Sequence, residues 1–317
     1  MFFISSVAFS SELPDSVRQK AVVHFDWKRT GVSFAAGMAL RLSIDAILKN
    51  NIHEMRPDRS GNNSFPSRHS TWAFGIGTKI SYRLGEVSPW WVIASHAGAS
   101  GVGMQRVMAA RHYAGDVMAG AGIGSVTSVL SYKIADWIFG SEHKYSGWRE
   151  CDNAVFRSLE VATSASFPFK RCVNGCELAT ALRTTMRFRM PVSERLYVTA
   201  SGMLSSAPLR VAEAPLKPLN AAAALAGVEC HIPFTSCRAL AAGIGVEAGA
   251  NCYLDHKYVE VKRWAPIVAA RVQMSVMLTS RLAVGGMLGY DFTSLGIDGA
   301  REWLSSVSVG FFSRANF

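Results

Sequence analysis

The first half of the chain contains cationic and histidine side chains whose spacing suits phosphate chemistry. Lys49 precedes Arg56 by seven residues, and Pro57 follows directly. Seven residues are two helical turns, so we expect both cations on one face of a helix that Pro57 ends. A phosphoryl group in transfer spreads negative charge over three oxygens, and positioned cations supply most of its stabilisation.

A second cluster, residues 65–69, reads Phe-Pro-Ser-Arg-His. It follows a Gly-Asn-Asn-Ser turn and precedes a helix that is predicted to begin near Ser70. A helix N-terminus offers free N–H groups and the positive end of the helix dipole, both of which favour an anion. This cluster therefore also suits a phosphate site.

The third cluster contains Arg106, His112 and Asp116. His112 and Asp116 are spaced i, i+4, so the carboxylate can face the imidazole and fix its tautomer. A histidine nucleophile splits a displacement into two steps, and a second histidine can act as acid and then as base. Each residue alone is usually a surface charge or a structural side chain. The three clusters in this order within 68 residues are very unlikely by chance.

The ordered set Lys-x6-Arg-Pro, Pro-Ser-x-His and Arg-x5-His-x3-Asp resembles the motif of the type-2 phosphatidic acid phosphatase superfamily, over residues 20–140. That superfamily includes lipid phosphate phosphatases, bacterial acid phosphatases and vanadium haloperoxidases. The resemblance implies a phosphoric ester hydrolase that acts on phosphomonoesters or pyrophosphates, including lipid-linked ones. No metal or other cofactor is expected, because three cationic side chains take the place of a metal.

The resemblance also implies a role for each motif residue. His112 is the nucleophile that forms a phosphohistidine, Asp116 holds and polarises it, and His69 is the general acid. The residues that bind the phosphoryl oxygens are Lys49, Arg56, Ser67 and Arg106.

Two positions depart from the usual motif. Arg68 stands where glycine is usual, so it adds a cation to the phosphate-binding set, and Gln105 stands where serine is usual. These departures leave open an alternative, a catalytically inactive domain that binds phosphate or a partner. A haloperoxidase is a further possibility that nothing in the sequence favours.

The elements that must position these residues differ between the two halves. Apolar residues recur at three- and four-residue spacing in the first half, which predicts helices. In residues 180–317, apolar residues alternate with small or polar ones in about eight segments, which predicts strands. The predicted fold class is α + β, with an all-α helical bundle followed by an antiparallel β-barrel of about eight strands. The predicted domains are 16–150 for the helical phosphatase, 151–179 for a linker and 180–317 for the barrel.

Strands with apolar side chains on one face and small or polar ones on the other are typical of a transmembrane β-barrel. The final Phe317 resembles the terminal aromatic residue of bacterial outer-membrane barrels. A soluble barrel or sandwich alternates in the same way and is the alternative. We expect a barrel in the bacterial outer membrane that acts chiefly as an anchor, with the helical domain in the periplasm; an inner-membrane location is the runner-up.

Composition excludes several classes of protein. Hydrophobic residues make up 49% of the chain and charged residues 18%, so the chain is not disordered. The net charge of +10 is spread over both halves without a basic block, so no nucleic-acid partner is expected. The expected partners are a phosphate ester or lipid phosphate substrate and the membrane.

All six cysteines follow residue 150, which suits disulfides in an oxidising compartment with their pairing left open. A zinc site is a weaker alternative, because only His231 and His256 lie nearby. Residues 1–15 are either the remnant of a signal peptide or an apolar terminus.

Overall fold

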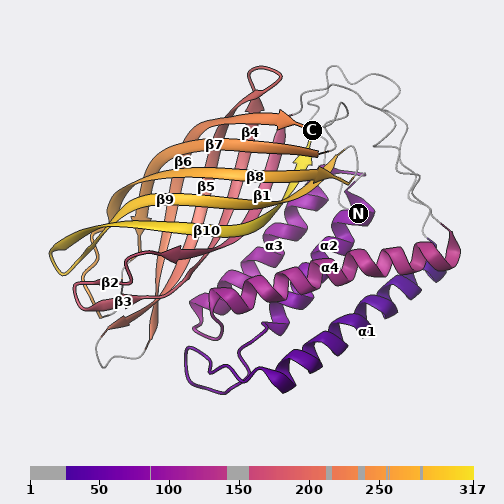
Figure 1. Ribbon diagram of the computed structural model, residues 1–317, viewed down its shortest axis with the longest axis horizontal. Coiled ribbons are helices and arrows are strands. Elements are labelled where there is room, and N and C mark those ends of the chain that lie inside the picture. The colour runs from indigo at the N-terminus through magenta and orange to yellow at the C-terminus, as the bar shows by residue number, and fades with distance from the viewer. Residues whose placement is uncertain are drawn as a thin grey trace, which may run out of the picture.

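The structure is a computed structural model that describes residues 26–85, 87–140, 157–211, 216–234, 240–254, 256, 258–278 and 281–317. Within these residues, four helices are followed by a closed antiparallel barrel of eight strands (Figure 1). The predicted fold class is therefore confirmed. The predicted signal-peptide remnant, residues 1–15, lies outside the described residues.

The helices are α1 (Trp27–Asn51), α2 (Arg68–Leu84), α3 (Pro89–Met108) and α4 (Ala114–Phe139). Their starts follow local capping rules. The Asp26 side chain accepts hydrogen bonds at the start of α1, Ser67 caps α2, and Pro89 occupies the first turn of α3. The helices alternate in direction, so the ends of α1 and α3 lie beside the starts of α2 and α4 (Figure 1).

The eight barrel strands pair antiparallel, and the ring closes where β1 pairs with β10, Ser158 opposite Asn316. A short hairpin, β2 (Cys172–Val173) and β3 (Cys176–Leu178), continues the sheet beside β5. Its turn, Asn174-Gly175, has positive φ at both residues, as tight hairpins require. The barrel strands are β1 (Ser158–Pro168), β4 (Ala181–Pro191), β5 (Leu196–Val211), β6 (Lys217–Pro233), β7 (Leu240–Tyr253), β8 (Trp264–Met277), β9 (Leu282–Ile297) and β10 (Ala300–Asn316).

The barrel begins earlier than the sequence predicted. Strand β1 lies inside residues 151–179, which the alternation pattern left as a linker, so the predicted barrel start at 180 is wrong. The reason is that the outer face of β1 meets protein instead of solvent or lipid. Its outward residues Thr163 and Ala165 are small and buried, so the apolar alternation weakens in the middle of the strand. Leu159, Val161 and Phe167 continue it on the same face.

The barrel interior is filled by paired charges. Glu160 is fully buried and accepts hydrogen bonds from Arg187 and Arg314, the latter at 2.9 Å. Glu247 lies 2.5 Å from Arg271 and also pairs with Arg187. Such a filled interior is typical of a small barrel and suits an anchor better than a channel.

The outer wall of the barrel is apolar and exposed, as is typical of a lipid-facing surface. Exposed aromatic residues lie toward both ends of the wall, with Phe167, Trp264 and Trp303 at one end and Phe234 and Phe317 at the other. The exposed aliphatic residues between them include Val198, Leu204, Val228, Ile244, Val246, Val268, Val272 and Leu288.

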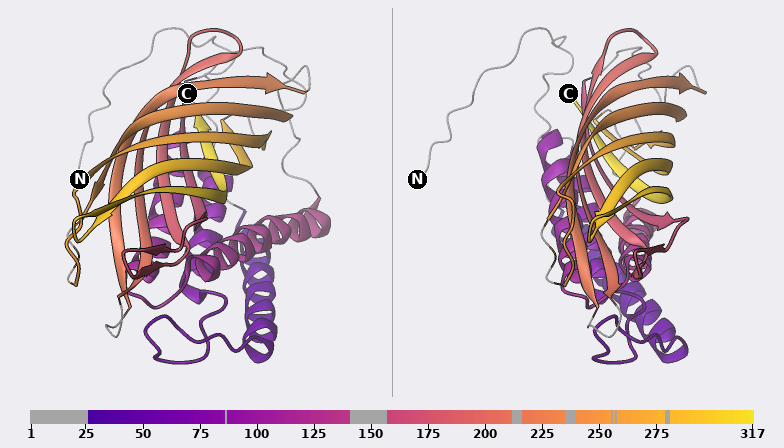
Figure 2. Two further views of the ribbon diagram at one scale, coloured as in Figure 1. Left: turned by 60° about the vertical axis from the view of Figure 1, so that its left-hand side comes forward. Right: turned by 90° about the vertical axis from the view of Figure 1, so that its left-hand side faces the viewer.

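The helical domain lies along the outer wall of the barrel over β1, β4 and β10 (Figure 2). Ser100 of α3 is 2.7 Å from Thr163 of β1, hydroxyl to hydroxyl. The ring of Phe74 in α2 meets that of Phe311 in β10, edge to face, at 5.4 Å between centroids. Apolar residues of α3 pack with the wall in a common core, Val92 and Ile93 with Val161, Leu282 and Ala315.

Within the described residues, α1 is long and apolar enough to cross a membrane by length and composition, with a hydropathy of 1.4 over its most apolar window. Its outward side chains Phe34, Met38 and Leu42 are exposed. The helical domain thus has an apolar exterior like that of the barrel.

The cysteines show no disulfide among the described residues, where Cys172, Cys176, Cys230 and Cys252 are free. Cys151 and Cys237 lie outside the described residues, so any pair that involves them stays a prediction.

The ion pairs inside the barrel lead to a stability prediction. We expect Glu160→Gln to lower the free energy of unfolding by about 3–5 kcal/mol, because it leaves Arg314 buried without a carboxylate partner. The control is Glu177→Gln, which removes an exposed pair with Arg210 and is expected to cost about 0–1 kcal/mol. Urea titration of the folded barrel in detergent measures both. Equal shifts in the two variants would contradict the prediction.

Candidate functional site

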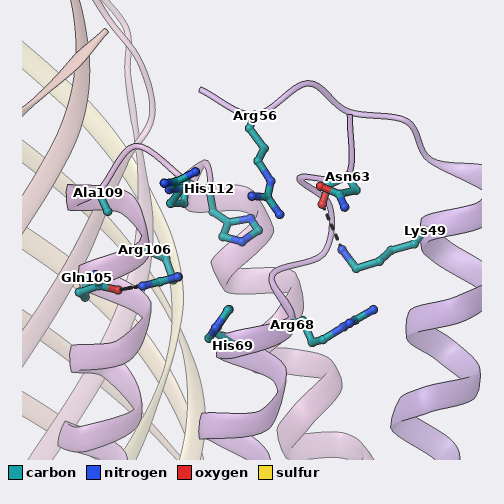
Figure 3. A pocket seen from close by; sticks show the side chains of 10 residues that line it. Lys49, Arg56, Asn63, Arg68, His69, Gln105, Arg106, Ala109 and His112 are labelled. Carbon is teal, nitrogen blue, oxygen red and sulfur yellow. Dashed lines mark hydrogen bonds between the residues drawn. The ribbon is translucent and has the colours of Figure 1, made fainter. Parts of the chain in front are cut away.

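A cavity of about 520 Å³ opens where the ends of α1 and α3 meet the starts of α2 and α4 (Figure 3). Five of its lining residues are cations and two are histidines, and no carboxylate is among the lining residues described. This cavity therefore attracts anions strongly. Its lining residues are Lys49, Arg56, Asn63, Arg68, His69, Gln105, Arg106, Ala109, Arg111 and His112.

His112 presents one ring nitrogen to a carboxylate and its other edge to the cavity. The Nδ1 atom is 3.5 Å from Asp116 Oδ2, and both side chains are buried. Asp116 is itself fixed, because its Oδ2 accepts hydrogen bonds from Ser64 Oγ at 2.5 Å and from the Tyr113 N–H at 2.9 Å. The carboxylate thus faces Nδ1, which makes no hydrogen bond at this distance, and leaves Nε2 for the cavity.

His69 lies in the first turn of α2, across the cavity from His112 (Figure 3). Its side chain is exposed to the cavity and to solvent. The structure therefore brings together the two histidines that the sequence analysis selected, 43 positions apart in the chain. A phosphoryl group between them would have one histidine on each side.

Three of the cavity cations keep an uncompensated charge. Lys49 Nζ donates to the carbonyls of Asn63 at 3.1 Å and Pro66 at 3.2 Å. Arg106 Nε donates to Gln105 Oε1 at 2.6 Å, and Arg56 Nε is buried without a hydrogen-bond partner. Neutral acceptors orient Lys49 and Arg106 without cancelling the positive charge of either side chain. The charge of all three cations is therefore available to an anion.

Two other cations already have carboxylate partners. Arg68 lies 2.8 Å from Asp45, and Arg111 lies 2.9 Å from Asp58. Although burial acts in the opposite direction, hydrogen bonds from Ser60 and the charge of Arg111 hold the pKa of Asp58 below its usual value. Arg68, predicted to bind phosphate, lines the cavity, but Asp45 shares its charge.

Ser67 has a structural role at the start of α2. Its side chain is fully buried, and its Oγ accepts hydrogen bonds from Ser70 N at 3.5 Å and Ser70 Oγ at 3.0 Å. The hydroxyl is therefore the N-cap of α2 and is not among the cavity-lining groups. The predicted hydrogen bond from Ser67 to the phosphate stays a prediction, because the hydroxyl accepts both of these bonds and its own hydrogen can still be donated.

The sequence analysis missed two residues behind the site. Ser64 is fully buried and supports Asp116, and only its position in the Gly-Asn-Asn-Ser turn could have indicated it. Glu54 is half-buried beside Asp116. Burial, then the charge of Asp116 and a hydrogen bond with it, raise the pKa of Glu54 to about 7.

Comparison with known proteins agrees with this geometry. A family model described as the PAP2 superfamily matches residues 30–139. This segment is a PAP2 superfamily domain. Over 120 residues the chain is 37% identical to a protein named "Lipid A 1-phosphatase" from Porphyromonas gingivalis. That match covers 38% of this chain and 27% of the relative, so the chain spans about a quarter of the relative's length.

Among solved structures, the chain is similar to the outer membrane protein OprG from Pseudomonas aeruginosa, with 8% identity and a TM-score of 0.38 over 51% of this chain and 96% of that one. It is also similar to Neisserial surface protein A, with 10% identity and a TM-score of 0.38 over the same shares.

The raised pKa of Glu54 predicts how the PAP2 domain responds to pH. An acid whose pKa rises on folding, here from 4.5 to about 7, stabilises the fold at low pH and loses that contribution as pH rises through about 7. Above that value, Glu54 and Asp116 are both charged and repel each other. Wild type should therefore lose thermal stability between about pH 4.5 and 7, and Glu54→Gln should lose less.

The thermal midpoint at several pH values tests this dependence, with Glu194→Gln as the control because Glu194 is exposed in the turn between β4 and β5. Parallel pH curves for wild type and Glu54→Gln would show that the Glu54 carboxyl group does not carry the effect.

Proposed function

We propose that the PAP2 domain is a metal-independent phosphatase that works through a phosphohistidine at His112. The observation that carries this proposal is the buried His112–Asp116 pair facing a cavity lined by five cations. An oriented imidazole is a nucleophile, and the cations stabilise the charge of a phosphoryl group in transfer. The inactive binding domain is the alternative that the experiment below addresses.

In the first step, His112 Nε2 attacks phosphorus, an N–P bond forms, and the bond between phosphorus and the leaving oxygen breaks. His69, across the cavity, gives its proton to that oxygen. Asp116 stabilises the imidazole while it carries the phosphoryl group. Lys49, Arg56 and Arg106 bind the phosphoryl oxygens.

In the second step, water attacks the phosphohistidine. His69, now neutral, accepts a proton from this water, the N–P bond breaks, and inorganic phosphate leaves. His112 returns to its starting form. The same cations stabilise the second transition state, because the charge distribution of the phosphoryl group is the same in both steps.

The substrate we propose is a phosphomonoester or pyrophosphate carried by a lipid. The similarity to a protein named for a lipid A phosphatase supports a lipid-linked phosphate. The apolar exterior of α1 and of the barrel supports it as well, because such surfaces suit a cavity that lies beside a membrane.

We propose that the barrel lies in a bacterial outer membrane, because its outward face is apolar and its interior is charged. The sequence analysis placed the helical domain in the periplasm. The packing of α3 along the barrel wall favours a position beside the barrel, within the same bilayer.

The first test is phosphate release by purified protein with EDTA present, on an aryl phosphate, phosphatidic acid and a prenyl pyrophosphate. We expect wild type to release phosphate and His112→Ala to release none, because no phosphoenzyme can form without the imidazole. His53→Ala is the matched control, since His53 is exposed and does not line the cavity. Release by His112→Ala, or a strict need for a divalent ion, would contradict the mechanism.

The role of His69 predicts a dependence on the leaving group. His69→Ala should slow hydrolysis of an alkyl phosphate by about 10²–10⁴-fold and of an aryl phosphate much less, because a phenolate leaves without a proton. Steady-state kcat on the two substrates measures this difference. Equal losses on both would rule out His69 as the general acid.

A further inference from the structure

We infer that the cavity opens on the outer leaflet of the membrane, at the external face, and that its substrate is a phosphorylated headgroup of a lipid in that leaflet. This inference rests on the proposed function and on the proposed membrane insertion. The inference specifies the side of the membrane on which the site acts. That side follows from the position of the cavity along the barrel.

The barrel has two different ends. At the first end, β1 begins and β10 finishes, and the connections 192–195, 234–239 and 278–281 join the strands. At the second end, the connections are 169–180, 212–216, 254–263 and 298–299, and they include the two longest of the barrel. In bacterial outer-membrane barrels, short turns face the periplasm and longer loops face the exterior. The first end is therefore periplasmic.

Helix α3 runs from the first end to the second. Near its start, the ring centroid of Trp90 lies 5.2 Å from that of Phe317, the last residue after β10. Its middle residue Ser100 contacts Thr163 of β1. Near its end, Met104 shares a core with Ala165 of β1, seven residues further along that strand than its start. The cavity follows directly, because Gln105 and Arg106 are the next residues of α3.

The other helices agree with this direction. Tyr113 precedes α4 and lies near Arg210, which is in β5 at the second end of the barrel. Burial raises the pKa of Tyr113, and the charge of Arg210 opposes this rise. Helix α1 ends at the cavity and α2 begins there, so all the cavity-lining residues belong to the second end (Figures 1 and 3). The polypeptide leaves α4 on the opposite side and begins β1 at the first end.

The surface next to the cavity suits a headgroup that stays in its leaflet. The exposed face of α3 that leads to Gln105 contains Ala94, Gly98, Gly101 and Val102 and no charge. Exposed Phe167 and Trp303 mark the membrane boundary at the same end of the barrel. The five cations thus lie at headgroup height beside hydrocarbon, where a phosphate reaches them from the side.

Accessibility of single cysteines in intact cells tests the side of the membrane. In a chain whose native cysteines are replaced by serine, Asn62→Cys reports on the exposed loop beside the cavity and Glu194→Cys on the turn at the first end. We expect a maleimide on a polymer too large to cross the outer membrane to label Asn62→Cys in intact cells and Glu194→Cys only after permeabilisation. The reverse pattern would overturn the inference.

If the serine background does not insert, a short epitope after Asn62 or Glu194 in the native chain, probed with antibody on intact cells, gives the same readout. Surface detection at Asn62 supports the inference, and detection at Glu194 alone overturns it. Neither assay depends on activity, so a protein that hydrolyses nothing would fail the proposed function and still report its orientation.

The lipid part has its own test on purified protein. We compare phosphate release from vesicles that contain long-chain phosphatidic acid with release from a soluble dihexanoyl analogue of the same headgroup. We expect kcat/KM to be at least about tenfold higher for the long-chain lipid, because binding to remote parts of a substrate contributes to turnover. Equal values would identify a soluble phosphate ester as the substrate and overturn this part.

Discussion

The packing of α3 against the outer wall of β1 is the contact on which the rest of the structure depends. It brings a helical domain and a barrel together through small residues, with the hydroxyls of Ser100 and Thr163 2.7 Å apart. It also fixes how far along the barrel the cavity lies, since α3 ends at the cavity. The same closeness recurs within the bundle. A Cβ at Gly120 would lie 2.5 Å from the Ser67 carbonyl oxygen, so only glycine lets α4 bring Asp116 beside the start of α2.

Both domains place polar groups inside and apolar groups outside. In the bundle, Arg41 donates to Thr127 and Ser128 of α4, and Lys79 donates to Ser33 and Ser131. In the barrel, arginines pair with glutamates across the interior. Charged side chains within a membrane protein face its interior and find partners there, because the hydrocarbon outside offers none. This arrangement gives the two domains a common apolar exterior.

The cavity follows a different rule from the barrel interior. In the interior, buried arginines have carboxylate partners, since an unpaired buried charge is costly. In the cavity, Lys49 and Arg106 have neutral partners and Arg56 Nε has none. Two other cavity cations do have carboxylate partners, Arg111 in Asp58 and Arg68 in Asp45, while Asp116 pairs with His112. Cations without a carboxylate partner can bind an anionic substrate, whereas the paired arginines of the barrel cannot. The charge distribution therefore distinguishes the binding site from the rest of the structure.

The sequence by itself determined the element types and most of the residues that line the site. Period and motif spacing predicted a helical bundle followed by a barrel, and His69, His112, Lys49, Arg56 and Arg106 all line one cavity. These predictions succeeded because motif spacing and the periods of helices and strands depend only on residues that are close in the sequence. Tertiary structure decided what depends on neighbours distant in sequence. It turned the hydroxyl of Ser67 into a helix cap, gave Arg68 a partner in Asp45, and added Ser64 and Glu54 behind Asp116. It made residues 158–168 a barrel strand, because they pair with β10 and β4, and the contact with α3 allows small residues at Thr163 and Ala165, where a lipid-facing strand would be more apolar.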